Sequence, residues 1–175
     1  MSLLSLVTPE NATGRVAEIY DEITWTFGSV PTGFQLHSVS PELFDDNWRN
    51  ISYFMEHKSL SFPLLALIRM LVSQDNQCDY CIGLNEALLI NKAGYTIEQI
   101  QGIKADPSTA PLSDKEKAML LFVLKATQNS KSITAEDIVA LKTLGWTDKD
   151  IYDGLAHGAR NMAMDVIFNA FQVDG

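Results

Sequence analysis

Hydrophobic residues recur along this chain at the three-to-four-residue spacing that is typical of amphipathic α-helices. The first two expected helices carry the following apolar positions: Val16, Ile19, Tyr20 and Ile23, then Leu43, Trp48, Ile51 and Phe54. No segment alternates hydrophobic and polar residues around Asn-Gly or Asp-Gly turns, which is the pattern of β-hairpins. The sequence therefore predicts an all-α fold with no significant sheet.

Further helices are expected in the middle of the chain. The apolar stretch Pro63–Val72 fits a buried strand or a buried helix, and its length, its leucine and methionine content and the proline at its head favour a helix. Leucines at 84, 88 and 89 continue a helix that ends at the next glycine. Met119–Ala126 predicts another buried helix, and the segment 138–144 predicts an amphipathic one.

Helix-start signals support a mostly helical chain. They comprise a capping side chain before proline at Thr8-Pro9 and Ser40-Pro41, capping-box spacing at Thr96–Gln99 and Ser113–Glu116, and a shorter-acid version at Thr134–Asp137 and Thr147–Asp150. The segment 102–113 holds two prolines and predicts a loop between two helical groups. It is too short and too apolar at its edges for an interdomain linker, so we expect one compact helical bundle, a single domain over residues 1–175.

The last helical segment, Asp148–Phe171, becomes apolar around most of its circumference after residue 162. A helix that is apolar all round is a buried helix. Two interpretations are compatible with this pattern and stay open: a central core helix, or a helix that a second subunit partly covers.

Composition narrows the class of protein. The chain has 175 residues, of which 46% are hydrophobic, and this suffices for one sizeable core. Thirteen basic against twenty-two acidic side chains give a net charge of −9, which argues against nucleic-acid binding and against docking on an anionic membrane. Apolar runs are too short to span a bilayer, and the first residues lack the basic region of a signal peptide. We expect a soluble, cytoplasmic protein.

Chemistry concentrates in the chain's two cysteines, Cys78 and Cys81. Residues three apart on a helix share a face, with Cβ atoms roughly 5–6 Å apart, so this pair can close a disulfide with little movement. Ser73 or Asn76 can cap the helix that follows, which would put Cys78 in its first turn. The helix dipole would there stabilise a thiolate, and Cys81 could resolve the oxidised product.

Two observations oppose or limit this interpretation. Asp75 and Asp79 flank Cys78, and a nearby carboxylate raises the pKa of a thiol. Two buried cysteines can also pack as small hydrophobic residues, although chance placement at this spacing is less common, so we favour a functional pair. Zinc needs four ligands, and the histidines show no ligand spacing, so we expect no metal and no cofactor.

The segment Val72-Ser73-x-x-Asn76-x-Cys78-x-Tyr80-Cys81 resembles the core of the alkylhydroperoxidase D and carboxymuconolactone decarboxylase family, most closely its peroxidase-related members. The resemblance implies an all-helical fold that starts a helix at the Cys-x-x-Cys motif, and a homo-oligomer, whether dimer, trimer or hexamer. It also implies that Cys81 is the peroxidatic cysteine and Cys78 the resolving one. This reverses the assignment from helix position, and the roles stay open.

The chain departs from the proton relay of that family. The family has a glutamate twelve residues before the first cysteine and a histidine four residues after the second, where this chain has Ala66 and Asn85. Asn85 lies near the cysteine face and can hydrogen-bond a sulfur, but an amide accepts no proton at neutral pH. His157 could replace the base, although a histidine hydrogen-bonded in the core or at an interface is the more common case. The candidate catalytic residues are therefore Cys78, Cys81, Asn85 and His157.

These residues predict a thiol–disulfide oxidoreductase that reduces small-molecule hydroperoxides in antioxidant defence and takes electrons from a thiol donor that the sequence does not identify. The degenerate relay leaves two alternatives. One is a non-catalytic oligomeric redox sensor that kept the pair, and the other is an enzyme similar to the decarboxylases.

Overall fold

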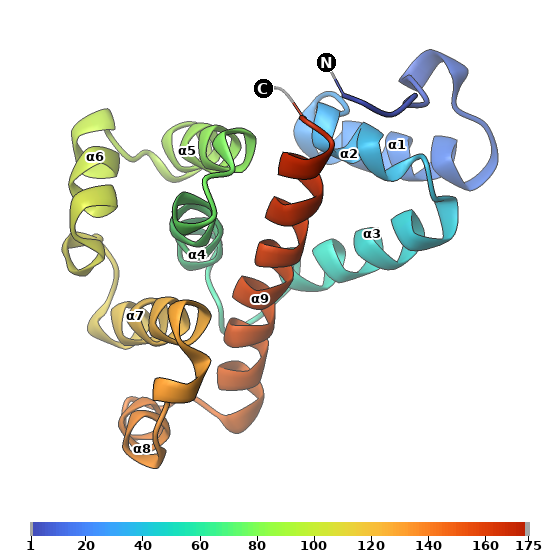
Figure 1. Cartoon of the computed structure of the whole chain (residues 1–175). Coiled ribbons are helices and arrows are strands. Elements are labelled where there is room, and N and C mark those ends of the chain that lie inside the picture. The colour runs from blue at the N-terminus through green and yellow to red at the C-terminus, as the bar shows by residue number, and fades with distance from the viewer. Residues whose placement is uncertain (1, 174–175) are drawn as a thin grey trace. The chain divides into compact units, whose positions relative to one another are not determined.

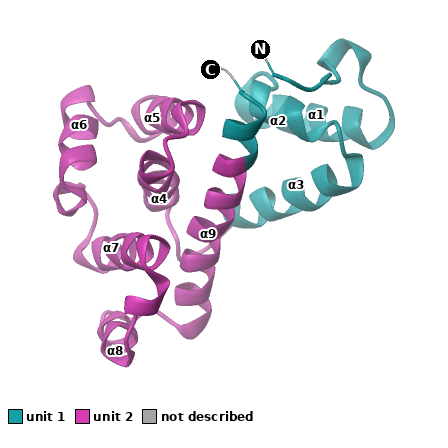
Figure 2. Cartoon of the chain, in the orientation of Figure 1, with its two compact units in different colours: residues 1–56, 167–175 teal, residues 57–166 magenta. Residues whose placement is uncertain are grey.

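The structure, a computed structural model, describes residues 2–173 and consists of α-helices and short 3₁₀ turns (Figure 1). It contains no strand within those residues, so the predicted all-α class is confirmed. In the same part of the chain, no helix combines the length and the apolar character needed to cross a bilayer. The contacts divide the chain into two compact units, residues 1–56 with 167–175 and residues 57–166 (Figure 2). The single domain over 1–175 stays a prediction.

The first unit is built on one apolar cluster. Its helices are α1 (Gly14–Phe27), α2 (Thr32–His37), α3 (Pro41–Met55) and the last turn of α9 (Asp148–Ala170). All four apolar positions expected in the first helix are buried. In the second, the expectation for Leu43 is wrong: its side chain is 63% exposed, and Phe44 is fully buried instead. Phe44 and Trp48 lie one turn apart on α3, so they share the face that packs on α1.

The first expected helix start is also corrected. Thr8-Pro9 begins only a 3₁₀ turn (Pro9–Asn11), because the backbone becomes extended at Ala12, and α1 starts at Gly14. The capping boxes are confirmed where the spacing predicts them. Thr96 Oγ1 accepts from the Gln99 backbone at 3.1 Å, and Ser113 Oγ accepts from the Glu116 backbone at 3.3 Å.

The second unit surrounds one deeply buried helix. Its elements are α4 (Phe62–Asp75), α5 (Asp79–Ala93), α6 (Ile97–Ala105), α7 (Asp114–Gln128), α8 (Ala135–Thr143) and α9 as far as Val166. The segment Pro63–Val72 is helical, as predicted, and its helix α4 packs against both α5 and α7 (Figure 1). The loop expected from residue 102 begins later, because α6 continues to Ala105.

The turn between α4 and α5 has a defined hydrogen-bond pattern. The backbone N–H of Cys78 donates to the Ser73 carbonyl at 3.0 Å, and that of Gln77 donates to the Gln74 carbonyl at 3.2 Å. This is the Schellman motif, in which the chain reverses through a left-handed residue. Gln77 occupies that position with φ +55°, a conformation that glycine adopts more readily. The turn makes Cys78 the N-cap of α5.

Helix α9 is buried through a polar face. Its buried residues are Asp150, Ile151, Asp153, Gly154, His157, Gly158, Asn161 and Asp165. The two glycines let neighbouring side chains approach closely, since a Cβ on Gly158 would lie 2.6 Å from Val123 Cγ1. The expectation of a core helix that is buried through its apolar residues is therefore wrong for this face.

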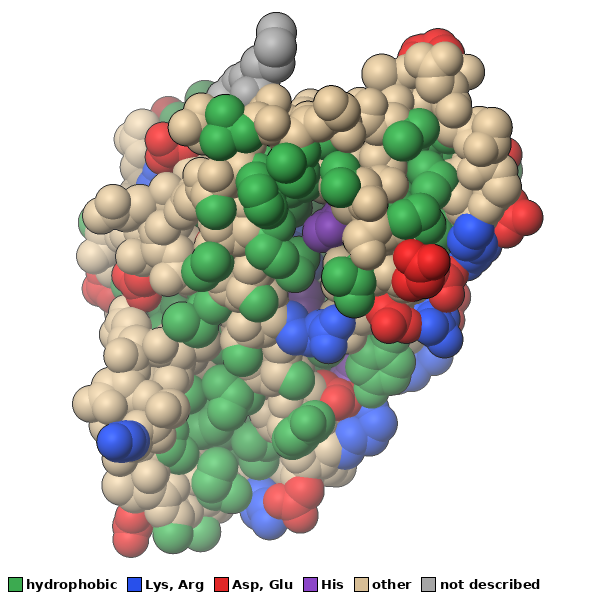
Figure 3. Space-filling view, turned by 45° about the vertical axis from the view of Figure 1, so that its right-hand side comes forward, with side chains coloured by type: hydrophobic (Ala, Val, Ile, Leu, Met, Phe, Trp, Pro, Cys, Tyr) green, Lys and Arg blue, Asp and Glu red, His purple; other side chains and the backbone are tan. Residues whose placement is uncertain are grey.

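Large hydrophobic side chains reach the surface elsewhere on the same helix. Tyr152 and Val166 of α9 are both exposed, and Figure 3 shows hydrophobic side chains at the surface of the face it displays. Exposed hydrophobic residues on a helix that is buried along its polar face agree with the interpretation that a second subunit covers part of it. That interpretation stays a prediction.

Candidate functional site

The two cysteines lie at the start of α5, one helical turn apart. Cys78 is the N-cap and Cys81 is the third residue of the helix. Their side chains are almost fully buried, with 1% and 5% exposed, and they are not joined in a disulfide. The motif therefore starts a helix, as the sequence predicts.

A carboxylate from a distant part of the chain completes a cluster with the sulfurs. One Asp165 carboxylate oxygen and the Sγ atoms of Cys78 and Cys81 all lie within 4.8 Å of one another. Asp165 belongs to the polar face of α9 and has no exposed surface. The site thus combines two thiols with a proton-carrying side chain that the sequence analysis did not identify.

Three polar side chains hold the carboxylate of Asp165. Ser73 Oγ donates to its Oδ1 at 2.8 Å, and Asn76 Nδ2 donates to its Oδ2 at 3.0 Å. Asn161 Nδ2 lies 3.3 and 3.1 Å from the two oxygens and 2.8 Å from Ser73 Oγ. Burying a carboxylate is costly unless hydrogen bonds compensate it, and these donors provide that compensation. The expectation that Ser73 or Asn76 caps α5 is wrong, because Cys78 is the N-cap.

The electrostatics distinguish the two thiols. The Cys81 thiol donates a hydrogen bond that lowers the pKa of Cys78, against the opposing effects of burial and of Asp165. The pKa of Cys81 is raised, first because its thiol is that donor and then by burial and by the negative charge of Asp165. The helix dipole also lowers the pKa of Cys78, because Cys78 lies at the N-terminus of α5. These effects favour ionisation of Cys78 over ionisation of Cys81.

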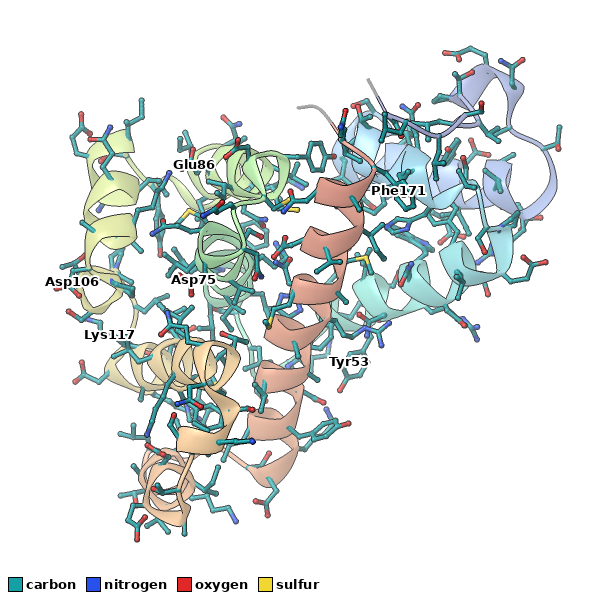
Figure 4. All side chains as sticks on the ribbon, viewed as in Figure 1. Tyr53, Asp75, Glu86, Asp106, Lys117 and Phe171 are labelled. Atoms are coloured by element: carbon teal, nitrogen blue, oxygen red, sulfur yellow. The ribbon has the colours of Figure 1, made fainter. Side chains whose placement is uncertain are left out.

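The flanking carboxylates take a different position from the one expected. Asp75, labelled in Figure 4 at the end of α4, is exposed and accepts a hydrogen bond from Gln128 Nε2 at 2.8 Å. Asp79 is exposed as well. The carboxylate that opposes ionisation of the thiols is Asp165, so the expectation from sequence neighbours named the wrong residues.

A second network lies beside the thiols and centres on Arg69 of α4. Arg69 Nε donates to Asn85 Oδ1 at 2.8 Å, and one terminal nitrogen lies 3.2 Å from His157 Nε2. Burial lowers the pKa of the guanidinium to about 10, while the charge of Cys81 acts in the opposite direction. Arg69 therefore carries its charge between neutral partners and within electrostatic reach of Cys81.

The other two predicted site residues, Asn85 and His157, both contact Arg69 in that network. Asn85 donates to the Cys81 carbonyl at 2.8 Å and accepts from Arg69, so both ends of its amide have partners other than sulfur. Burial and the charge of Arg69 lower the pKa of His157 to about 3. Its Nε2 atom lies 3.2 Å from a terminal nitrogen of Arg69 and 3.3 Å from the Leu65 carbonyl oxygen, so the tautomer decides which of the two it bonds. The catalytic roles of Asn85 and His157 stay predictions, and Ala66 is fully buried in α4.

Sequence reasoning missed Asp165, Asn161 and Arg69. A signal for the first two exists, because His157, Asn161 and Asp165 recur every four residues along a helix whose last part is otherwise apolar. Polar residues at helical spacing within an apolar helix indicate a buried polar face. Nothing in the sequence pattern shows which residues that face would contact.

Comparison with solved structures supports the fold. Two similar structures are an uncharacterized peroxidase-related protein from Silicibacter sp. TM1040 (TM-score 0.86) and an alkylhydroperoxidase D core protein, also peroxidase-related, from Ralstonia eutropha JMP134 (TM-score 0.87). Each is 21% identical in sequence, and each match covers 99% of this chain and 91% of the other. No protein-family model and no curated protein matches the sequence.

A third similar structure is that of the debrominase Bmp8, a Cys-to-Ala variant in complex with 2,3,4-tribromopyrrole. It is 15% identical, the match covers 100% of this chain and 95% of the other, and the TM-score is 0.73. The resemblance that the cysteine segment suggests is thus confirmed for the fold.

Proposed function

We propose, on the premise that this chain has the alkylhydroperoxidase D-like fold, that it is a thiol–disulfide oxidoreductase that reduces hydroperoxides with Cys78 and Cys81. The observation that carries the proposal is the cluster of two sulfurs and one carboxylate oxygen within 4.8 Å. Two thiols at this distance can form a disulfide, and a carboxylate beside them can move the protons that the reaction requires. Asp165 would carry the proton that the side chains of Ala66 and Asn85 cannot carry.

The first step is attack of the Cys78 thiolate on the terminal oxygen of a hydroperoxide. The S–O bond forms while the O–O bond breaks, so the sulfur is oxidised to a sulfenic acid and an alkoxide leaves. The proton released when Cys78 ionised, held by Asp165, passes to the alkoxide and gives the alcohol. The lowered pKa of Cys78 favours this sulfur as the nucleophile.

The second step joins the two sulfurs. Asp165 accepts the proton of Cys81, whose sulfur then attacks the Sγ atom of Cys78. The S–S bond forms, the S–O bond breaks, and the departing hydroxide takes the proton from Asp165 and becomes water. One hydroperoxide and two thiols therefore give one alcohol, one water and one disulfide. An external thiol donor, whose identity the structure leaves open, returns the pair to the reduced state.

The surroundings of the sulfurs support chemistry in spite of their burial. Cys78 and Cys81 are nearly inaccessible, but their neighbours are polar, with a serine, an asparagine and Asp165 in one network and Arg69 beside Cys81. A pair that only fills space would have apolar neighbours. Because so little of either sulfur is exposed, we expect small hydroperoxides to react faster than bulky ones.

The test uses serine variants of each cysteine in the reduced full-length protein. We expect Cys78→Ser to consume no hydroperoxide, and Cys81→Ser to consume one equivalent and to stop with a sulfenic acid on Cys78, identified by trapping and mass spectrometry. If the Cys78→Ser variant instead consumes one equivalent and carries a sulfenic acid on Cys81, the two roles are reversed, in agreement with the family resemblance. Undiminished consumption by both variants would refute the proposal.

A second candidate follows from the structural similarity to the debrominase. A dithiol supplies two electrons, so the same pair can replace a carbon–bromine bond by carbon–hydrogen while it becomes a disulfide and releases bromide and a proton. Incubation of the reduced protein with 2,3,4-tribromopyrrole distinguishes the candidates. Stoichiometric bromide release with no reaction toward hydroperoxides would favour this second function, and the absence of bromide would exclude it for this substrate.

The assembly of the chain is part of the proposal. We propose a homo-oligomer, because the resemblance implies one and because large hydrophobic side chains, among them Trp25, Tyr152 and Val166, are exposed. Light scattering on the purified protein measures the mass of the particle directly. A monomer at micromolar concentration would contradict this part of the proposal and would leave the thiol chemistry intact.

A further inference from the structure

We propose that Cys78, Cys81 and Asp165 also form a binding site for a thiophilic divalent cation of the Zn²⁺ class, which would block the redox pair. The metal site goes beyond the proposed function and does not depend on it; only its effect on hydroperoxide reduction rests on that function. The motivating observation is that three buried side chains of suitable chemistry each offer one ligand atom, and that these atoms lie within 4.8 Å of one another.

The donor set suits zinc. Thiolate sulfur and carboxylate oxygen are both zinc ligands, at about 2.3 Å and about 2.0–2.2 Å from the metal. Ligand atoms on a tetrahedron of that size lie less than 4.8 Å apart, so small side-chain movements would close the three around an ion. Three protein ligands leave a fourth position for water or for a small external ligand. Two soft thiolates favour Zn²⁺ over Mg²⁺ or Ca²⁺, which prefer oxygen ligands.

The sequence alone offers only half of this site. Two cysteines supply two of the ligands, and the histidines lack ligand spacing. The third ligand becomes visible in the fold, because α9 brings Asp165 to the first turn of α5. The distance along the chain explains why sequence spacing does not reveal it.

Outer contacts already orient the carboxylate. Ser73 and Asn76 each donate to a different oxygen of Asp165, at 2.8 and 3.0 Å, and Asn161 donates from the preceding turn of α9. Partners of this kind fix the direction of a metal ligand and contribute to metal affinity. The carboxylate therefore needs little ordering when an ion binds.

The local charges balance when the metal is present. Two thiolates and one carboxylate carry three negative charges, and a divalent cation with the guanidinium of Arg69 supplies three positive ones. Arg69 lies within electrostatic reach of Cys81, and its side-chain partners Asn85 and His157 are neutral. A buried cluster with no net charge has a lower desolvation cost than one with an excess of either sign.

The consequence is that metal binding and disulfide formation exclude each other. A disulfide uses the electron pairs and removes the thiolates that the cation needs, so oxidation by a hydroperoxide would release the metal. Bound cation would in turn protect both sulfurs from oxidation. Free Zn²⁺ would therefore act as a reversible inhibitor of the dithiol.

The test is a titration of the reduced, full-length protein with Co²⁺ and then Zn²⁺, without any peroxide. We expect one equivalent of Co²⁺ to produce thiolate-to-cobalt charge-transfer absorption, Zn²⁺ to displace it, and the disulfide form to bind neither. Asp165→Asn should weaken binding by at least about 10-fold, the lower end of the effect seen even for outer-shell partners. The control Asp150→Asn removes another buried carboxylate of α9 and should leave the affinity unchanged.

X-ray absorption on the zinc-loaded wild-type protein keeps the proposal testable if Asp165→Asn does not fold. We expect two sulfur ligands and one or two light ligands around each zinc ion. Four sulfur ligands, no binding by the reduced protein, or full affinity in a folded Asp165→Asn variant would overturn the proposal. Hydroperoxide consumption measured separately, with a chelator present, tests the proposed function independently.

Discussion

Asn161 Nδ2 lies within hydrogen-bond distance of both carboxylate oxygens of Asp165, at 3.3 and 3.1 Å, one turn further along α9. The same amide nitrogen lies 2.8 Å from Ser73 Oγ, which itself donates to Asp165. The two residues belong to a polar network that reaches from Ser73 to the pair of sulfurs. This arrangement makes the proposed chemistry depend on α9 as much as on the cysteine motif.

We predict that Asp165→Asn slows hydroperoxide-driven disulfide formation by about 100-fold or more, because an amide of the same shape cannot carry a proton. The measurement is the pseudo-first-order rate of thiol loss in the reduced protein. The matched control is Asp150→Asn. Asp150 is a buried carboxylate in the first turn of the same helix, and its Oδ2 accepts from the backbone N–H and the hydroxyl of Thr147. A rate equal to that of the wild type would show that Asp165 moves no proton in the reaction.

We predict that Asn161→Ala lowers the free energy of unfolding by about 1–3 kcal/mol, since it leaves the buried oxygens of Asp165 and Ser73 short of a donor. Urea unfolding at neutral pH measures the difference. Arg160→Ala, which removes the neighbouring exposed side chain, should change stability by less than about 0.5 kcal/mol. Equal effects of the two substitutions would contradict the assigned role of Asn161.

Two glycines provide a matched pair for the packing of α9. A Cβ on Gly158 would meet Val123 Cγ1 at 2.6 Å, and the stiff, branched valine has little room to move. We expect Gly158→Ala to destabilise the fold by about 1–3 kcal/mol. Gly83→Ala, on α5 with no atom within 4 Å of the new Cβ, should stabilise it by about 0.5–1 kcal/mol. Thermal unfolding of both variants tests the prediction, and a stabilising Gly158→Ala would contradict the close approach of α9 and α7.

Stability should fall as the pH decreases below the ordinary histidine pKa of 6.5. Burial lowers the pKa of His37 to about 4, and burial with the charge of Arg69 lowers that of His157 to about 3. Between these values and 6.5 the unfolded chain binds more protons than the folded one, so acid favours unfolding. Each histidine contributes at most about 1.4 kcal/mol per pH unit in this window.

The measurement is the free energy of unfolding at about pH 7 and about pH 5, where the ordinary carboxylates are still ionised. His37→Gln should reduce the loss on acidification, because it removes one of the two histidines. The His37 ring contacts the rings of Phe44 and Phe168, and burial among such apolar groups lowers its pKa. A wild-type stability that is constant or rises toward pH 5 would contradict the prediction.

The sequence predicts the helices well and their buried faces less well. Spacing identifies α1, and apolar composition identifies α4, because one-sided or continuous hydrophobicity follows directly from burial. It fails at Leu43, where two adjacent apolar residues compete and only the packing partner decides that Phe44 is buried. It fails again on α9, whose buried face is polar and whose apolar residues Tyr152 and Val166 are exposed.

One part of the candidate site can be predicted from the sequence and another part cannot. The Cys-x-x-Cys motif is local, so its position at a helix start can be predicted from the sequence and is present in the structure. The third member, Asp165, reaches the sulfurs only through the packing of α9 against α4 and α5. The sequence suggests Asp75, which is adjacent to the motif, as the carboxylate that acts on the thiols. In the structure Asp75 instead accepts a hydrogen bond from Gln128.

The most direct measurement is the stoichiometry of a single reaction between the reduced protein and a small hydroperoxide, followed by counting thiols and alcohol. The account predicts that each hydroperoxide reduced removes two thiols, yields one alcohol, and joins Cys78 to Cys81 within one chain, as peptide mapping would show. Hydroperoxide left unconsumed while both thiols stay free would contradict it.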